Sequence, residues 1–253
     1  MTTALRFPRR MLAAFTALLA VAALTAALAP AAQADGRWKK DRNASLTLVH
    51  GIPGDSLGAT RQLPVQVRVY RLFDGTKVFD GVTFPAVAGP LSVKPGFYRI
   101  QVRVTGTSIA LTRWTYLSPG ENVSAVAYLT DSGRLGNPAG KPAPQLAVFT
   151  NDVSSPGAGK ARVIVRHLAD APAVDVLAGG APLINALSNP GSASAVVPAG
   201  TYPIQVVADA DTSISAFGPA NLTFDAGTTT VVYAVGSFFD GSFAPQLQVL
   251  PGA

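Results

Sequence analysis

One ten-residue stretch occurs twice in this chain, as PGFYRIQVRV at residues 95–104 and as AGTYPIQVVA at residues 199–208. Five such pairs follow one another in the same order in the two halves, which indicates a tandem duplication with a period of about 101–117 residues. That period is too long for a solenoid repeat and suits two domains. The other four pairs are 45–53 with 162–170, 63–70 with 172–179, 118–128 with 225–235, and 143–148 with 244–249.

The repeated segments have the alternation of half-buried β-strands. In the first copy, apolar residues occupy every second position from Tyr98 to Val104, and Arg99, Gln101 and Arg103 lie between them. A period of two places one face of a strand on a core and the other in water. Short alternating strands separated by Pro and Gly predict an all-β chain, with two tandem antiparallel immunoglobulin-like β-sandwich domains after an N-terminal signal peptide.

The first 34 residues carry the features of that signal peptide. A segment with three arginines and no acid precedes an apolar run, "MLAAFTALLAVAALTAALA", and an Ala-x-Ala sequence ends at Ala34. This order is typical of a secretory signal that is cleaved, with a retained membrane anchor as the alternative. The predicted organisation is 1–34 signal peptide, 35–44 flexible mature N-terminus, 45–150 first sandwich, 151–160 linker and 161–253 second sandwich.

A Gly-x-Tyr corner opens the repeated strand in both copies. We expect Gly96 and Gly200 to take positive φ values. We expect Tyr98 and Tyr202 to bury their rings and to bond through the hydroxyl to nearby backbone, as in a tyrosine corner. Pro203 lacks an amide donor and predicts an edge strand or a strand start.

Charge and cysteine content limit the function classes. The chain has no cysteine, which excludes disulfides and thiolate metal sites. Residues 35–155 contain 14 basic and 8 acidic residues, a formal charge of +6, whereas residues 156–253 contain 3 and 6, a charge of −3. A basic half favours anionic surfaces, although ordinary solvated charge explains it as well. The first half also has the longer loops, at 54–62 and 131–142.

The second half contains RHLADAPAVDV at residues 166–176, followed by PAGTYPIQV and AGTTTVVYAVG. These segments resemble the secreted bacterial domain-of-unknown-function family 4397, most clearly over 161–249, with a diverged copy over 45–149. The resemblance implies secretion, a β-sandwich and frequent tandem copies at the cell envelope. It implies no activity.

The candidate site residues are few and repeat-related. His50 and His167 are the only histidines and hold the same position in the two copies. One histidine per domain does not make a multi-histidine zinc site, so we expect each to be a structural residue at the end of its sandwich, bonded to backbone or, for His167, to Asp170. The repeat-equivalent and motif candidates are therefore His50, His167, Tyr98, Tyr202, Asp170 and Asp175.

The sequence predicts no catalytic, cofactor or metal site. Glu121 is the only glutamate, so the carboxylate pair of a glycosidase would have to come from aspartates. Asp209 and Asp211 lack the spacing of an EF-hand loop and predict a solvated turn rather than a calcium site. The basic segment 36–43 either contacts an anionic wall polymer or a membrane surface, or is a solvated terminus.

These observations favour a secreted, non-catalytic extracellular or cell-envelope binding or structural module without a cofactor. The expected partner is a cell-wall polymer or another surface protein, with no nucleic acid and no transmembrane anchor after signal cleavage. The alternatives are a hydrolase that acts on cell-wall polymer or glycan, and a purely structural spacer.

Overall fold

The computed structural model describes residues 42–252 apart from 63, 73–75 and 135–139, and the side chains of 76–81 are not described either. The predicted signal peptide and residues 35–41 of the predicted flexible N-terminus lie outside the described residues. Within them the regular elements are strands, apart from the 3₁₀ turn η2 (Asp55–Leu57). None of these residues form a helix with the length and apolar character of a membrane span.

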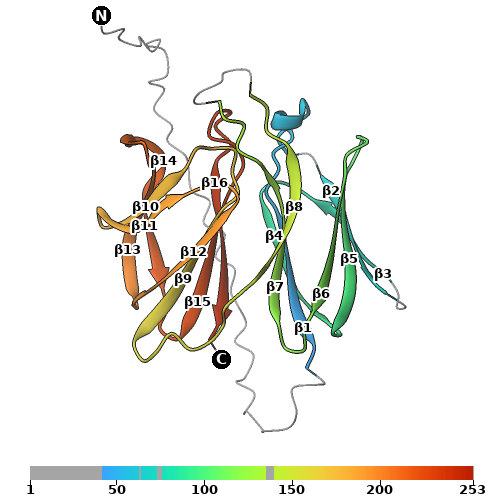
Figure 1. The fold of residues 1–253 in the computed structure, drawn as a ribbon, viewed down its shortest axis with the longest axis horizontal. Helices are drawn as coiled ribbons and strands as arrows, with labels where there is room; N and C mark the ends of the chain where they lie inside the picture. Colours follow the sequence, from blue (N-terminus) through green and yellow to red (C-terminus); the bar gives the residue numbers. More distant parts are fainter. Residues whose placement is uncertain (1–41, 63, 73–75, 135–139, 253) are drawn as a thin grey trace, which may run out of the picture. The chain divides into compact units, whose positions relative to one another are not determined.

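The first half forms two four-stranded sheets. Figure 1 shows how their strands are arranged. One sheet has the order β4-β1-β7-β8 and the other the order β3-β2-β5-β6. The strands are β1 (Ala44–His50), β2 (Val65–Arg71), β3 (Thr76–Val82), β4 (Ala86–Val93), β5 (Gly96–Val104), β6 (Ala110–Leu117), β7 (Asn122–Leu129) and β8 (Pro144–Thr150).

The second half repeats this topology strand for strand. Its sheets have the orders β12-β9-β15-β16 and β11-β10-β13-β14, so each strand matches the one eight places earlier. The strands are β9 (Lys160–His167), β10 (Val174–Ala178), β11 (Ala181–Leu187), β12 (Gly191–Pro198), β13 (Gly200–Ala208), β14 (Asp211–Phe224), β15 (Thr228–Val235) and β16 (Ala244–Pro251). The predicted all-β fold of duplicated sandwich-like units is therefore confirmed.

The sheets differ in detail from a seven-stranded immunoglobulin constant domain, which divides its strands four and three. The described residues of each half form eight strands, four in each sheet. The first strand of each half runs parallel to the seventh, as β1 with β7 and β9 with β15, and the remaining pairs are antiparallel.

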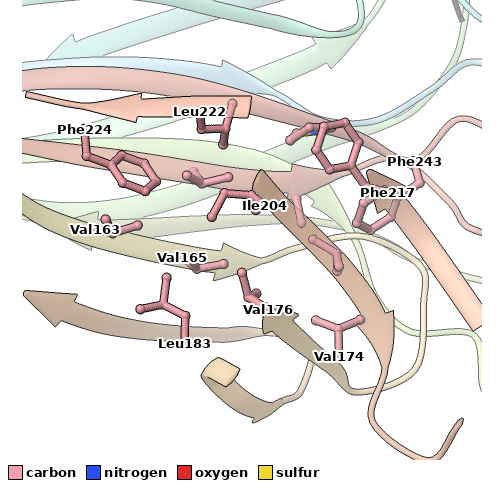
Figure 2. Close-up of a pocket in the computed structure, with 14 residues that line it drawn as sticks. Val163, Val165, Val174, Val176, Leu183, Ile204, Phe217, Leu222, Phe224 and Phe243 are labelled. Carbon is pink, nitrogen blue, oxygen red and sulfur yellow. The ribbon is translucent and has the colours of Figure 1, made fainter. Parts of the chain in front are cut away.

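The cores follow the predicted alternation. The alternate apolar residues from Val65 to Val69 of β2 and from Tyr98 to Val104 of β5 lie in the first core, together with residues of β1 and β7. The second core is built in the same way from β9, β10, β11 and β13. It encloses a cavity of about 20 Å³, into which apolar side chains such as Val165, Val176 and Ile204 point (Figure 2). A cavity of this size holds about one water-sized sphere, and its apolar lining favours an empty one.

A third apolar cluster joins the two halves. It contains Val49, Phe84, Val126 and Tyr128 from the first half and Ile164, Leu168, Val231, Tyr233, Val235 and Leu250 from the second. The central strands β7 and β15 are consequently buried on both faces, with seven buried residues each after a partly buried first residue. Strands of this kind read as continuous apolar runs rather than as alternations.

The tyrosine hydrogen bonds occur in both copies. The Tyr98 hydroxyl donates to the Lys94 carbonyl over 2.6 Å, and the Tyr202 hydroxyl donates to the Pro198 carbonyl over 2.8 Å. Tyr98 is fully buried, whereas Tyr202 is only partly buried and stacks on Phe224.

Two expectations about this corner are wrong. Gly96 has a φ of +145°, as expected, but Gly200 does not have a positive φ, so the second copy reaches the same tyrosine bond without a left-handed glycine. Pro203 lies inside the central strand β13 and not at an edge or a strand start. Its carbonyl accepts from the Gly179 amide, beyond the end of the short strand β10. The Pro203 nitrogen points to the same side as its carbonyl, and therefore toward this turn. The amide hydrogen that proline lacks would not have donated to a neighbouring strand there, so no hydrogen bond of the sheet is lost.

Candidate functional site

The two histidines end equivalent strands and are buried. His50 is the last residue of β1 and His167 the last residue of β9, with exposed fractions of 3% and 0%. The His50 ring lies edge-on to Phe84, with 6.3 Å between ring centroids. The Nε2 atom of His167 lies 2.9 Å from the Pro172 carbonyl oxygen. Of the two partners expected for His167, the structure contains the backbone one.

The environment of His167 favours a neutral ring. Burial lowers its pKa, against the opposing effects of the Pro172 and Ala171 hydrogen bonds and of the Asp131 charge. Since a carbonyl can only accept, Nε2 carries the proton, and Nδ1 is then an acceptor for which the described residues supply no hydrogen-bond donor. A buried, neutral histidine held by backbone suits a structural role.

Asp170 connects segments of both halves. Its carboxylate accepts hydrogen bonds from the Ser237 hydroxyl over 2.9 Å and from the Ser132 amide over 2.8 Å, and it is fully buried. Ser132 belongs to the longer loop of the first half. The other long loop reaches the same region, because Arg61 donates to the carbonyls of Asp240 and Gly241. Both extra loops thus bond to the second half.

Asp175 stabilises a bulge in the neighbouring strand. Ala186 has a φ of +49°, which few non-glycine residues adopt, and the register between β10 and β11 shifts there. The Asp175 carboxylate accepts the Ala186 amide over 2.8 Å. Asp175 therefore satisfies a backbone donor that the bulge displaces from the ladder.

Glu121 and Asp211, two other acids considered in the sequence, also have local partners. Glu121 accepts from the Ser118 amide and the Thr150 hydroxyl. Asp211 accepts from the backbone and side chain of Ser213 at the exposed start of β14, and these bonds lower its pKa. Across the part of the chain that the structure describes, no group of three or more His, Cys, Asp or Glu side chains could hold a metal ion.

A buried polar cluster lies where the two halves meet. Arg166, with an exposed fraction of 1%, donates to the Tyr233 hydroxyl, the Asn151 side-chain oxygen and the Thr150 carbonyl. Its guanidinium also lies 4.6 Å from the centre of the Phe149 ring. Burial lowers the pKa of Arg166, and the Tyr233 oxygen opposes that shift. These partners are neutral, so the cluster positions the halves and offers no acid–base pair.

The polar cluster extends across the contact through Tyr233. The Tyr233 hydroxyl bonds to Ser124 and to Gln248, and Gln248 in turn donates to Thr47. Asn151, the first residue of the predicted linker, donates to Asn122 and Ser124. The flexibility of the rest of residues 151–160 remains a prediction, and so does independent folding of each half.

The most distinctive surface is the outer face of the β3-β2-β5-β6 sheet. Alternate residues of β2, β5 and β6 point away from the first core and pair across the strands in rows. One row is Tyr70–Arg99–Trp114, and the next is Arg68–Gln101–Thr112. We call this surface the aromatic–arginine face; it comprises Gln66, Arg68, Tyr70, Leu72, Phe97, Arg99, Gln101, Arg103, Thr112, Trp114 and Tyr116.

Its large side chains are open to solvent. The exposed fractions are 58% for Trp114, 57% for Phe97 and 52% for Tyr116. The Phe97 and Tyr116 rings meet edge to face, with centroids 4.9 Å apart. The Arg99 guanidinium lies 4.3 Å from the centre of the Tyr70 ring and 5.7 Å from that of Trp114. These contacts hold the rings and the cation against one another on the surface of the sheet.

The aromatic–arginine face is electropositive. It carries Arg68, Arg99 and Arg103, and strands β2, β5 and β6 contain no acidic residue. The pKa of the Tyr70 phenol is lowered, first by a hydrogen bond from Arg68 and further by the charges of Arg68 and Arg99, with desolvation opposing. The same arginine charges would attract an anionic group of a ligand.

A hollow adjoins this surface at the β5–β6 turn. It has a volume of about 400 Å³ and is open to solvent. Gln66 and Arg103 line it together with residues 104–110 of the turn, so it continues the last row of the aromatic–arginine face. Sites for small ligands begin at about this volume.

The second half provides an internal comparison, because the duplication preserves the backbone. Tyr98 matches Tyr202, so the register places Thr201 and Thr223 where Phe97 and Tyr116 lie. By the same register, Pro203 replaces Arg99 and Asn221 replaces Trp114. These four residues are exposed, and none is aromatic or charged. The fold therefore does not require the rings and cations of the first copy.

Sequence reasoning placed Arg99, Gln101 and Arg103 on the solvent side but missed the aromatic residues beside them. Phe97 alternates with the inward Tyr98, and Trp114 and Tyr116 alternate with Thr115 and Leu117. The alternation of inward and outward residues along these strands therefore places the three aromatic side chains on the solvent side. Trp114 and Tyr116 were missed because β6 belongs to none of the five repeated segments.

The family described as Domain of unknown function (DUF4397) matches residues 44–177. The matched range contains the whole first sandwich, β9 and nearly all of β10, and it includes Asp170 and Asp175. No curated protein matches the chain in sequence.

Proposed function

The chain belongs to the DUF4397 family, whose description states no activity, and we propose that it acts as a secreted, non-catalytic binding module of the cell envelope or extracellular space. Its ligand binds to the aromatic–arginine face of the first sandwich. The second sandwich supports the first through the shared apolar cluster and the Arg166 polar cluster.

One observation carries this proposal: three large aromatic side chains are more than half exposed on one sheet face, beside arginines, where the duplicated copy has small polar residues. Contiguous exposed rings cost solubility and contribute little to the core, so they indicate an interaction surface. Loss of these residues from the other copy, with the fold kept, argues against a structural reason for them.

The non-catalytic assignment rests on the chemistry of the candidate residues. His167 is buried and bonded to backbone, Asp170 accepts from a serine and an amide, and Asp175 stabilises a bulge. Each therefore has a structural task. The extracellular assignment rests on the charged segment, the apolar run and the Ala-x-Ala sequence of residues 1–34.

A binding assay on cell envelopes tests the proposal. Purified 35–253 is incubated with washed envelopes of the producing cells, and the bound fraction is measured after sedimentation. We expect Phe97→Ala/Trp114→Ala to lose retention, whereas the matched Thr201→Ala/Asn221→Ala variant keeps it. Equal retention of both variants would refute the assignment of this face. Sequencing the N-terminus of the exported protein tests cleavage near Ala34.

A further inference from the structure

We infer that the ligand of the aromatic–arginine face is an acidic polysaccharide, a linear polymer of pyranose sugars that carry carboxylates. This inference rests on the proposed function and adds the chemical class of the ligand. It follows from three properties of the face: the spacing of its rings, its charge, and the neutral hydrogen-bonding groups between its cations.

The rings are spaced for a polymer. Trp114 and Tyr116 are two residues apart on β6, hence roughly 7 Å apart along the strand, and Tyr116 lies one strand away from Phe97, at about 5 Å. The C–H faces of successive sugars in one chain can pack on such neighbouring rings. A flexible polyol phosphate chain has no ring to place there, so the aromatic residues favour a polysaccharide.

The cations select an anionic chain. Arg68, Arg99 and Arg103 lie in three successive rows, and these strands hold no acid. A guanidinium binds a carboxylate through two parallel hydrogen bonds. Arginines in separate rows match single charges repeated along a chain better than one concentrated charge.

Neutral polar groups lie between the cations. Gln101 donates to the Thr112 hydroxyl at 3.5 Å, and Gln66 accepts from Arg68 at 2.6 Å. Such amides and hydroxyls can exchange hydrogen bonds with sugar hydroxyls. In a lipid bilayer the same groups would have to be desolvated without partners, which is costly. The hollow lined by Gln66 and Arg103 gives the polymer a place to continue beyond the rows.

The experiment compares two polymers with the same rings and different charge. Binding of purified 35–253 to polygalacturonate and to its methyl-esterified form is measured by calorimetry at several salt concentrations. We expect polygalacturonate to bind on the order of tenfold more tightly, with an affinity that falls as salt rises.

Variants separate the contributions of ring and charge. Arg68→Gln/Arg103→Gln should remove the preference for the charged polymer and most of the salt dependence. Trp114→Ala should weaken both polymers by on the order of tenfold. Arg113→Gln is the control for loss of charge, because it removes one arginine from β6 at a position outside the face, and it should bind like the parent. Unchanged thermal unfolding of each variant shows that its fold is intact.

Three outcomes overturn the inference. Tighter binding to single-stranded oligothymidylate or to phosphatidylglycerol vesicles would assign the face to a nucleic acid or a membrane. Failure of both polygalacturonate forms, with envelope retention still dependent on Phe97 and Trp114, would refute the ligand class and leave the proposed function standing. Envelope retention that is independent of these residues would refute both.

Discussion

Trp114 and Asn221 occupy the same position in the two sandwiches: Trp114 pairs with Arg99, one residue after Tyr98, and Asn221 pairs with Pro203, one residue after Tyr202. The tyrosines keep the same hydrogen bond to backbone four residues earlier. After duplication, the inward residues of this sheet kept their roles and the outward residues diverged. On this sheet the difference between the copies therefore lies at the solvent-facing surface, where we propose that the ligand binds.

Replacing Trp114 by the residue of the other copy should leave stability almost unchanged. Trp114 is 58% exposed and belongs to no core, so we expect Trp114→Asn to change the free energy of unfolding by less than about 0.5 kcal/mol. Denaturant midpoints at unchanged slope measure this. Ile100→Ala, in the core beneath, is the positive control and should cost about 2–5 kcal/mol. A large loss for Trp114→Asn would mean that the rings serve the fold.

The two tyrosine corners should differ in strength. Tyr98→Phe removes a hydrogen bond from a fully buried tyrosine and should cost about 1–3 kcal/mol. Tyr202→Phe removes a solvent-exposed bond and should cost less, about 0.5–1 kcal/mol. The measurement is chemical denaturation of the full chain with both single variants. Equal losses would show that the partial exposure of Tyr202 has no energetic effect.

Strand positions and core residues could be predicted because burial on one face leaves a period of two in the sequence. The alternation from Tyr98 to Val104, with arginines outside, corresponds to the buried and exposed residues of β5. Continuous apolar strands such as β7 have no such period, because a third cluster covers their second face. The contact between the halves was therefore not predicted, and neither was the position of Arg166, whose partners Thr150 and Tyr233 are distant in sequence.

The candidate binding surface was only partly predictable for a different reason. Parity places single side chains on a face, but the rows Tyr70–Arg99–Trp114 depend on the strand order and register. Pro203 shows the same limit. From the sequence alone, the missing amide hydrogen of a proline predicts an edge strand. In the structure, β10 ends beside Pro203 of β13, so the proline fits inside the sheet.

Arg166 should contribute to stability through its partners. Arg166→Ala leaves a space at the contact, and the Asn151 side-chain oxygen and the Tyr233 hydroxyl lose the hydrogen bonds that Arg166 donates. We therefore expect the free energy of unfolding to fall by about 3 kcal/mol or more. Arg166→Met keeps much of the side-chain volume and should lose less. Thermal and denaturant unfolding of both variants provide the comparison. If both variants match the parent, the polar cluster does not hold the halves together.

The second half, expressed as residues 156–253, should fold cooperatively but with lower stability than in the full chain. It has its own core, which supports folding, but it loses the first-half members of the third cluster and the Asn151 contact of Arg166. We expect one sigmoidal transition at a lower denaturant concentration than that of the full chain. A non-cooperative transition would show that the two halves share a single folding unit.

His167 should make stability depend on pH below about 6.5. Burial lowers the pKa of His167 in the folded chain, so the ring is neutral in both states at pH 8, and the unfolded chain takes up the proton first as the pH falls. The unfolded state then binds more protons, so the free energy of unfolding decreases by up to about 1.4 kcal/mol per pH unit, until the folded ring is protonated too.

His167→Gln keeps an Nε2 donor for the Pro172 carbonyl and cannot titrate. Its free energy of unfolding, measured from pH 8 to pH 5, should therefore fall less steeply than that of the parent chain. Superimposable slopes for the two proteins would mean that the histidine is as easily protonated in the folded chain as in the unfolded one.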